Sequence, residues 1–237
     1  MEELKRAIIL AAGEGSRLRP VSLETPKPLV SVNGIRLIDT SIQALKENDI
    51  HEIYIVAGYK KEQFHNIYKN DPNIKILDNP YYLKGNNITS LYIARAYIPG
   101  SFVLEGDLRI YNESILNRFI NKSGYCVNWI SKTDEWVLDV EKGSIKNCKK
   151  EGGTEAYRLW GVSMWTEEDG KRLSELVRKQ IEDTNDWSRY WDEIALFEHK
   201  SEFDLGIREI DEGDIIEIDS LKELVSLDPS YMKYLKQ

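Results

Sequence analysis

Apolar and polar residues follow one another along the first half of the chain in short blocks that predict alternating strands and helices. Apolar runs at 7–10, 51–58 and 73–77 are typical of buried parallel strands. The segments between them, 36–47 and 59–69, are typical of helices, with apolar residues of the first at helical spacing. This alternation predicts an α/β domain with a doubly wound, mostly parallel sheet.

The second half of the chain has a different pattern, which predicts a small subdomain. A strand at 125–130, a hairpin at 137–149 and a strand at 157–165 precede a helix at 166–182. All six tryptophans lie between residues 129 and 191. We therefore expect one domain spanning the whole chain, with an insertion at about 131–200 that binds a substrate.

Composition excludes several classes of protein. The 237 residues carry a net charge of −8, which argues against a general nucleic-acid binder. No apolar run approaches the roughly 18 residues of a membrane span, and the first residues do not resemble a signal peptide. Three scattered histidines and the two cysteines, Cys126 and Cys148, give no zinc spacing. We expect a cytoplasmic protein with buried or incidental thiols, and with neither membrane nor nucleic acid as partner.

The first predicted strand leads into a glycine-containing loop that is suited to phosphate. Small residues allow a ligand to approach the backbone closely, where N–H groups can donate hydrogen bonds. Prolines flank Lys27 on both sides, so we expect a stiff, extended segment that aims its ammonium group. The loop matches neither a Walker A motif nor a complete dinucleotide fingerprint. The alternative is an ordinary strand–turn with surface cations. The expected nucleotide-binding residues of this loop are Leu10, Ala11, Ala12, Gly13, Glu14, Gly15 and Arg17.

This stretch resembles the signature of the sugar-phosphate nucleotidyltransferases. The matching residues are L-A-A-G-x-G-S-R-L-x-P, from residue 10, and T-P-K-P-L, from residue 25. A weaker resemblance covers most of the chain and is closest to the bacterial choline-phosphate cytidylyltransferases. It implies a Rossmann-like nucleotidyltransferase fold and catalytic roles for Arg17 and Lys27.

Two acidic strand ends are candidates for a metal site. Asp107 follows the apolar strand 102–104, and a carboxylate there needs a positive partner, for which Mg²⁺ bound to nucleotide phosphates is suited. Asp219 follows a second strand and either caps the next helix or, as the resemblance implies, provides the second metal ligand. The resemblance makes both aspartates catalytic. The roles of Glu105, Arg109 and Glu217 stay open.

A polar helix entrance is the candidate for base recognition. Asn86, Asn87 and Ser90 lie where a loop enters a helix, and the resemblance implies that this region reads the nucleobase. The alternative is helix capping by Asn87 or Thr89.

Aromatic residues beside carboxylates are the candidates for acceptor binding. A trimethylammonium group has no N–H donor and is bound by aromatic faces and nearby negative charge. We expect Trp129, Trp160 and Trp165 to serve packing, because they lie in apolar strand patterns. The expected acceptor-binding residues are Lys27, Glu135, Trp136, Tyr190, Trp191 and Asp192.

The resemblance implies a Mg²⁺-dependent transfer from CTP to phosphocholine, giving CDP-choline and pyrophosphate. The expected preference for CTP over UTP or dTTP rests on the resemblance alone. Alternative acceptors are a sugar 1-phosphate, phosphoethanolamine, aminoethylphosphonate or another amine-bearing phosphate. A regulatory nucleotide-binding protein is a further alternative. The sequence leaves open whether the protein is a monomer or a homodimer.

Overall fold

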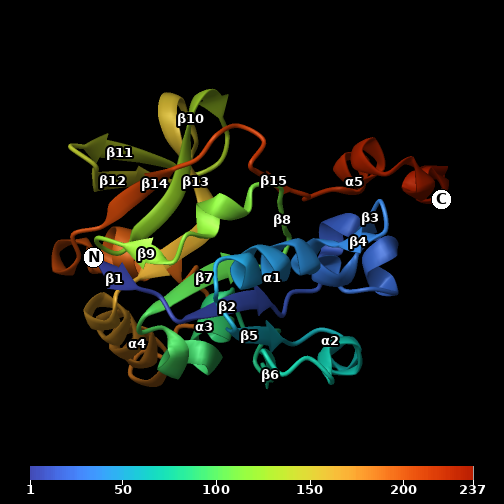
Figure 1. Cartoon of the computed structure of the whole chain (residues 1–237), viewed down its shortest axis with the longest axis horizontal. Coiled ribbons are helices and arrows are strands. Elements are labelled where there is room, and N and C mark those ends of the chain that lie inside the picture. The colour runs from blue at the N-terminus through green and yellow to red at the C-terminus, as the bar shows by residue number, and fades with distance from the viewer. Residues whose placement is uncertain (237) are drawn as a thin grey trace.

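Four parallel strands form one end of the main sheet in this computed structural model, which describes residues 1–236. They are β7 (Ser101–Glu105), β2 (Arg6–Ala11), β5 (Glu52–Ala57) and β6 (Ile74–Asp78), side by side in that order. Figure 1 shows them in the lower half of the molecule, with helices on both sides. The predicted Rossmann-like, mostly parallel sheet is therefore confirmed.

Residues of β2 alternate between two cores on opposite faces of the sheet. Ile8 and Leu10 belong to the core covered by α3 (Ile88–Ala94) and α4 (Glu167–Glu182). Their neighbours on β2 belong to the other core, covered by α1 (Leu37–Glu47) and α2 (Lys61–Tyr68). Because helices cover both faces of the sheet, β2 is a continuous apolar run. Its backbone is accessible to a ligand at the carboxyl end of the strand.

The sheet continues into a mainly antiparallel upper lobe through one long strand, β13 (Gly153–Trp165). The end of β13 pairs with β7, and its earlier part contacts β11 (Val137–Glu141). Along most of its length, β13 also pairs with β10 (Gly124–Thr133). The lobe is completed by β12 (Ser144–Lys149) and β14 (Gly206–Glu209). The predicted hairpin and both predicted long strands are thus confirmed.

The C-terminal arm crosses back from the upper lobe to the loops beyond β2. Figure 1 shows this arm in red on the right, where α5 (Leu221–Leu227) is followed by a last helical segment before the C-terminus. Leu224 and Ile218 pack with Leu18 and Val32 in a third, smaller core. This packing brings a segment near residue 219 against the glycine-containing loop.

The remaining elements are short. The strands are β1 (Glu2–Glu3), β3 (Ser31–Val32), β4 (Ile35–Arg36), β8 (Leu108–Ile110), β9 (Phe119–Ile120) and β15 (Ile215–Glu217). The 3₁₀ segments are Ser16–Leu18, Val21–Leu23, Lys27–Leu29, Arg95–Tyr97, Glu113–Leu116, Lys200–Glu202 and Pro229–Lys236, with a π-helical turn at Ile194–Glu198.

Two local predictions were wrong. Trp129 does not serve core packing, because it is 59% exposed on β10, with its ring edge-on to Tyr157. Trp160 and Trp165 are buried as predicted. Lys27 is not in an extended segment but begins a 3₁₀ turn.

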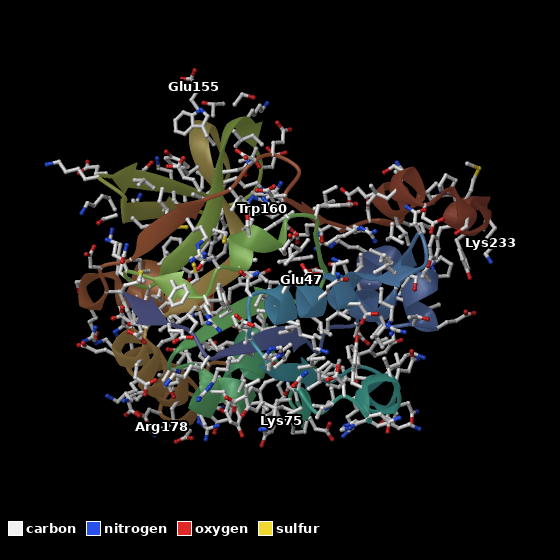
Figure 2. All side chains as sticks on the ribbon, in the orientation of Figure 1. Glu47, Lys75, Glu155, Trp160, Arg178 and Lys233 are labelled. Atoms are coloured by element: carbon white, nitrogen blue, oxygen red, sulfur yellow. The ribbon has the colours of Figure 1, made fainter. Side chains whose placement is uncertain are left out.

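Charged side chains such as Lys75, Glu155 and Arg178 lie along the outer margin of the molecule, as Figure 2 shows.

Two expectations about the thiols and the membrane can be compared with the described residues. Cys126 and Cys148 are buried free cysteines. Among residues 1–236, no helix has the length and apolar character needed to cross a membrane.

Candidate active site

A cavity of about 620 Å³ lies at the carboxyl ends of β2 and β7. Its floor is the backbone of the glycine-containing loop, and its walls come from the 82–90 segment, the upper lobe and the C-terminal arm. Ligands of doubly wound sheets bind at this edge, so the position agrees with the chemistry expected of the loop.

Lys27 is the centre of one end of the cavity. Its side chain is 8% exposed, and Nζ donates to Asp107 Oδ2 at 2.6 Å and to Asp219 Oδ1 at 2.9 Å. Burial lowers the pKa of Lys27, but the two carboxylates outweigh it, so the pKa lies above its usual value. Lys27 is therefore a fixed positive charge held within the protein.

A 3₁₀ turn holds Lys27 in position, in place of the extended segment that the sequence predicted. Leu29 N donates to Pro26 O at 2.8 Å, and Val30 N donates to Lys27 O at 3.1 Å, which closes the 3₁₀ turn. Gly15 adopts a left-handed conformation with φ of 58°, and a Cβ on it would lie 2.7 Å from Lys27 Cβ. The second glycine of the loop is thus required both for the turn and for the approach of Lys27.

Asp219 is not a helix cap. The cap of α5 is Ser220, whose hydroxyl accepts from Glu223 N, while the Glu223 carboxylate accepts from Ser220 N. This capping box leaves the Asp219 side chain to face Lys27 and Arg17, and Arg17 NH2 lies 2.7 Å from Asp219 Oδ1. The capping alternative for Asp219 is therefore excluded.

Three carboxylates converge beside Lys27. Asp107, Glu217 and Asp219 each place one oxygen within 4.8 Å of the others. Burial, together with Asp107 and Asp219, raises the pKa of Glu217 to about 8, against the opposing effect of Lys27. Oxygen ligands of this kind suit a hard divalent cation such as Mg²⁺. The three residues therefore fit a magnesium site, in which Glu217 joins the two predicted aspartates.

Asn87 links two walls of the cavity. It occupies the N-cap position of α3, but its side chain makes no cap bond. Nδ2 donates to Glu105 Oε1 at 2.9 Å, and Oδ1 accepts from Trp191 N at 3.0 Å. Burial, followed by the charges of Asp107 and Asp192, raises the pKa of Glu105 well above its usual value. Thr89 does not cap the helix with its side chain either, since its hydroxyl donates to Asn86 O. Asn87 and Glu105 thus form a polar pair between the two ends of the cavity.

The other end of the cavity is aromatic and acidic. Tyr190 and Phe197 both lie edge-on to Trp136, with ring centroids 5.7 Å from it. Asp192 lines the same end, and burial raises its pKa to about 7, although the Tyr125 hydroxyl and backbone N–H partly offset the effect. This end offers aromatic faces and carboxylates to a cation.

Most of the predicted site residues line this one cavity. It brings together the predicted phosphate, base and acceptor groups from the loop after β2, the entrance of α3 and the upper lobe. Those that line it are Leu10, Ala11, Ala12, Gly13, Gly15, Arg17, Lys27, Asn86, Asn87, Ser90, Asp107, Glu135, Trp136, Tyr190, Asp192 and Asp219.

Two predicted residues lie elsewhere. Trp191 is 3% exposed and packs in the core against Tyr125 and Trp165. Its side chain therefore does not line the cavity, contrary to the predicted role in acceptor binding. Its neighbours Tyr190 and Asp192 line the cavity instead. Glu14 is absent from the cavity wall and lies 3.8 Å from Arg19.

Sequence reasoning missed several wall residues. Gly161 on β13 lies so close to Glu105 that a Cβ would be 2.7 Å from Glu105 Cγ. Tyr82 is held against Gly58, where a Cβ would be 2.7 Å from the tyrosine ring. A glycine within a strand is a signal of such a close approach. Arg109, by contrast, is buried and donates to Val32 O, so it serves the structure rather than the cavity.

Several known proteins are similar to this chain in sequence. The nucleotidyl transferase family matches residues 6–128. A 2-aminoethylphosphonate cytidylyltransferase of Lancefieldella rimae is 36% identical, over 99% of this chain and 96% of that protein. A choline-phosphate cytidylyltransferase of Streptococcus pneumoniae is 32% identical, over 94% and 96%.

Solved structures of known proteins share the fold of this chain. The CTP:phosphocholine cytidylyltransferase of Streptococcus pneumoniae superimposes with a TM-score of 0.87 at 30% identity, covering 95% of this chain and 98% of that one. An inositol-1-phosphate CTP transferase of T. maritima has a TM-score of 0.78 at 20% identity and shares the fold.

The raised pKa of Asp192 predicts a pH-dependent stability. Its pKa rises from 3.8 to about 7 on folding, so this contribution to stability is present at low pH and is lost as the pH rises from about 4 to about 7. Asp192→Asn removes the contribution. We expect the free energy of unfolding of the variant, relative to the wild type, to increase across this range in urea titrations.

The control for this titration is Asp186→Asn. Ser188 and Arg189 hold the pKa of Asp186 below its usual value, so it is ionised in both states above about pH 5. Its effect on unfolding should stay constant from pH 5 to pH 7. A constant effect of Asp192→Asn over the same range would contradict the assignment.

Proposed function

Because the chain belongs to the nucleotidyl transferase family, we propose that it is a CTP-dependent cytidylyltransferase whose acceptor is phosphocholine. The observation that carries the proposal is one cavity with a lysine between carboxylates at one end and aromatic rings beside a carboxylate at the other. Relatives named as cytidylyltransferases, each aligned over nearly the whole chain, support the nucleotide.

In this proposal, the nucleotide lies along the glycine-containing loop that follows β2. Backbone N–H groups of the loop would donate to the phosphates. Arg17, whose side chain is 70% exposed and pairs with Asp219, would contact the leaving pyrophosphate. Asn86 and Ser90 at the entrance of α3 are placed against the base. The loop thus binds the triphosphate with few side chains.

Asp107, Glu217 and Asp219 would hold Mg²⁺. Lys27 bonds to Asp107 Oδ2 and Asp219 Oδ1, so the second oxygen of each aspartate is available to a cation along with the Glu217 carboxylate. When bound, Mg²⁺ neutralises charge on the triphosphate oxygens.

The reaction is an in-line displacement at the α-phosphorus. An oxygen of the acceptor phosphate forms the new bond, and the bond to pyrophosphate breaks. That oxygen is already anionic, so no strong general base is required. Lys27 holds the α-phosphate or the incoming phosphate and stabilises the charge of the transition state, and Arg17 stabilises the leaving pyrophosphate. Catalysis is then positioning and charge stabilisation by residues already fixed in place.

The region at about 131–200 supplies most of the acceptor wall in this proposal. Trp136 and Tyr190 face the trimethylammonium group, and Asp192 and Glu135 provide negative charge. The second candidate acceptor is 2-aminoethylphosphonate. It is favoured by the relative of 36% identity and by the two carboxylates, which suit a primary ammonium.

A pyrophosphate-release assay tests the proposal. Each of CTP, UTP, dTTP and ATP is combined with phosphocholine, 2-aminoethylphosphonate, phosphoethanolamine and glucose 1-phosphate. We expect the highest kcat/KM with CTP and phosphocholine, and no release without Mg²⁺. Preference for another nucleotide, or for the sugar phosphate, would overturn the assignment.

Asp107→Asn should lower kcat by more than about 100-fold, because it removes charge directed at the transition state. The variant keeps the size of the side chain, and circular dichroism checks that it is folded. Glu113→Gln, an exposed substitution in the 3₁₀ turn beyond β8, is the control and should leave kcat unchanged. A folded Asp107→Asn enzyme with near-normal turnover would exclude the metal role.

Trp136→Ala should raise the KM for phosphocholine by about 5- to 30-fold, equivalent to about 1–2 kcal/mol for a lost cation–π contact. Trp129→Ala is the matched control, because Trp129 lies in the same lobe but is 59% exposed and outside the cavity wall. Steady-state kinetics at saturating CTP measure both. Equal KM values in the two variants would argue against the aromatic acceptor site.

A further inference from the structure

Lys150, a residue outside the cavity wall, lies against the aromatic end of the site. It follows β12, and its Nζ is 5.1 Å from the ring centroid of Trp136 and 5.0 Å from that of Phe197. Trp136 lines the cavity, whereas Lys150 does not. The indole that faces the acceptor therefore already has one cation over its ring.

A buried carboxylate fixes the position of this ammonium group. Lys150 Nζ donates to Glu193 Oε1 at 2.7 Å, and the Glu193 side chain is only 9% exposed. Arg189 NH1 lies 3.3 Å from the other oxygen, Glu193 Oε2. A carboxylate so deeply buried must be paired, so Lys150 is held in place although its own side chain is 37% exposed.

A fixed cation over the ring lowers the attraction of Trp136 for a second cation. The attraction arises from the negative face of the ring, and the two cations also repel each other directly. Glu193 offsets part of this charge, but the ammonium is the group that lies over the ring. We propose that Lys150 is a specificity-determining residue, which weakens binding of a quaternary ammonium acceptor at Trp136. The proposal rests on the function proposed above.

A primary ammonium depends less on Trp136. It can donate hydrogen bonds to Asp192 and Glu135, whereas a trimethylammonium group has no donor and depends on the aromatic faces. Lys150 therefore changes the ratio of the two activities rather than the overall rate. Loss of its charge favours the quaternary acceptor selectively.

The test compares kcat/KM for phosphocholine and for 2-aminoethylphosphonate at saturating CTP. Lys150→Met keeps a long side chain that packs against aromatic rings, and Lys150→Gln keeps a donor for Glu193. In both variants, we expect the ratio of phosphocholine to aminoethylphosphonate activity to rise about 3- to 10-fold. Thermal unfolding verifies that each variant is folded.

Two control variants separate charge over the ring from charge in general. Lys149→Met removes the neighbouring lysine, which pairs with Asp139 at 3.0 Å, and should leave the ratio within about twofold of the wild type. Lys150→Arg keeps the positive charge and should also leave it unchanged.

The outcomes distinguish the two proposals. A ratio that does not change in a folded Lys150→Met or Lys150→Gln enzyme, or an equal loss with both acceptors, overturns the role of Lys150 while the proposed function stands. A wild-type enzyme that uses neither amine acceptor overturns both.

Discussion

The contact of one buried ammonium group with two carboxylates constrains the whole structure. Lys27 is separated from Asp107 by 80 residues and from Asp219 by 192. A buried charge is stable only when it is paired. The end of β7 and the C-terminal arm must therefore both reach the loop after β2. The third core, around Leu18 and Ile218, supplies the apolar contacts that hold the arm there.

Strand pairing and the side chain of Asn87 fix the distance between the two ends of the cavity. β13 pairs with β7 at its base and carries the upper lobe at its other end, so the acceptor wall is continuous with the central sheet. Asn87 adds a direct link, since its side chain bonds to Glu105 on β7 and to the backbone of Trp191. Reacting groups bound at the two ends are thereby oriented by rigid elements rather than by loops alone.

The two ends of the cavity present different charged and aromatic groups. At the Lys27 end, cations and carboxylates alternate within hydrogen-bonding distance, which suits phosphates and a metal ion. At the Trp136 end, aromatic rings and Asp192 supply attraction for an ammonium group, and Lys150 lies against the rings from outside. The acceptor proposed above, with a phosphate and an amine, would match this polarity. The cations at the Lys27 end offer a local basic site in a protein whose net charge is −8.

The sequence by itself determined the parallel sheet and the glycine-containing loop, because these depend on local patterns of apolar runs and strand ends. It also singled out Lys27, Asp107 and Asp219, but the expectation that Asp219 is a metal ligand and not a helix cap came from the family resemblance. Only the tertiary structure decided which aromatic residues face the cavity. Trp191 lies beside a carboxylate in the sequence, as Trp136 does, yet it is buried in the core. Trp129 lies in an apolar strand pattern, yet it is exposed. Glu217 and Lys150 acquire their partners from segments distant in sequence. A local pattern cannot encode such contacts, because each depends on how separate elements pack.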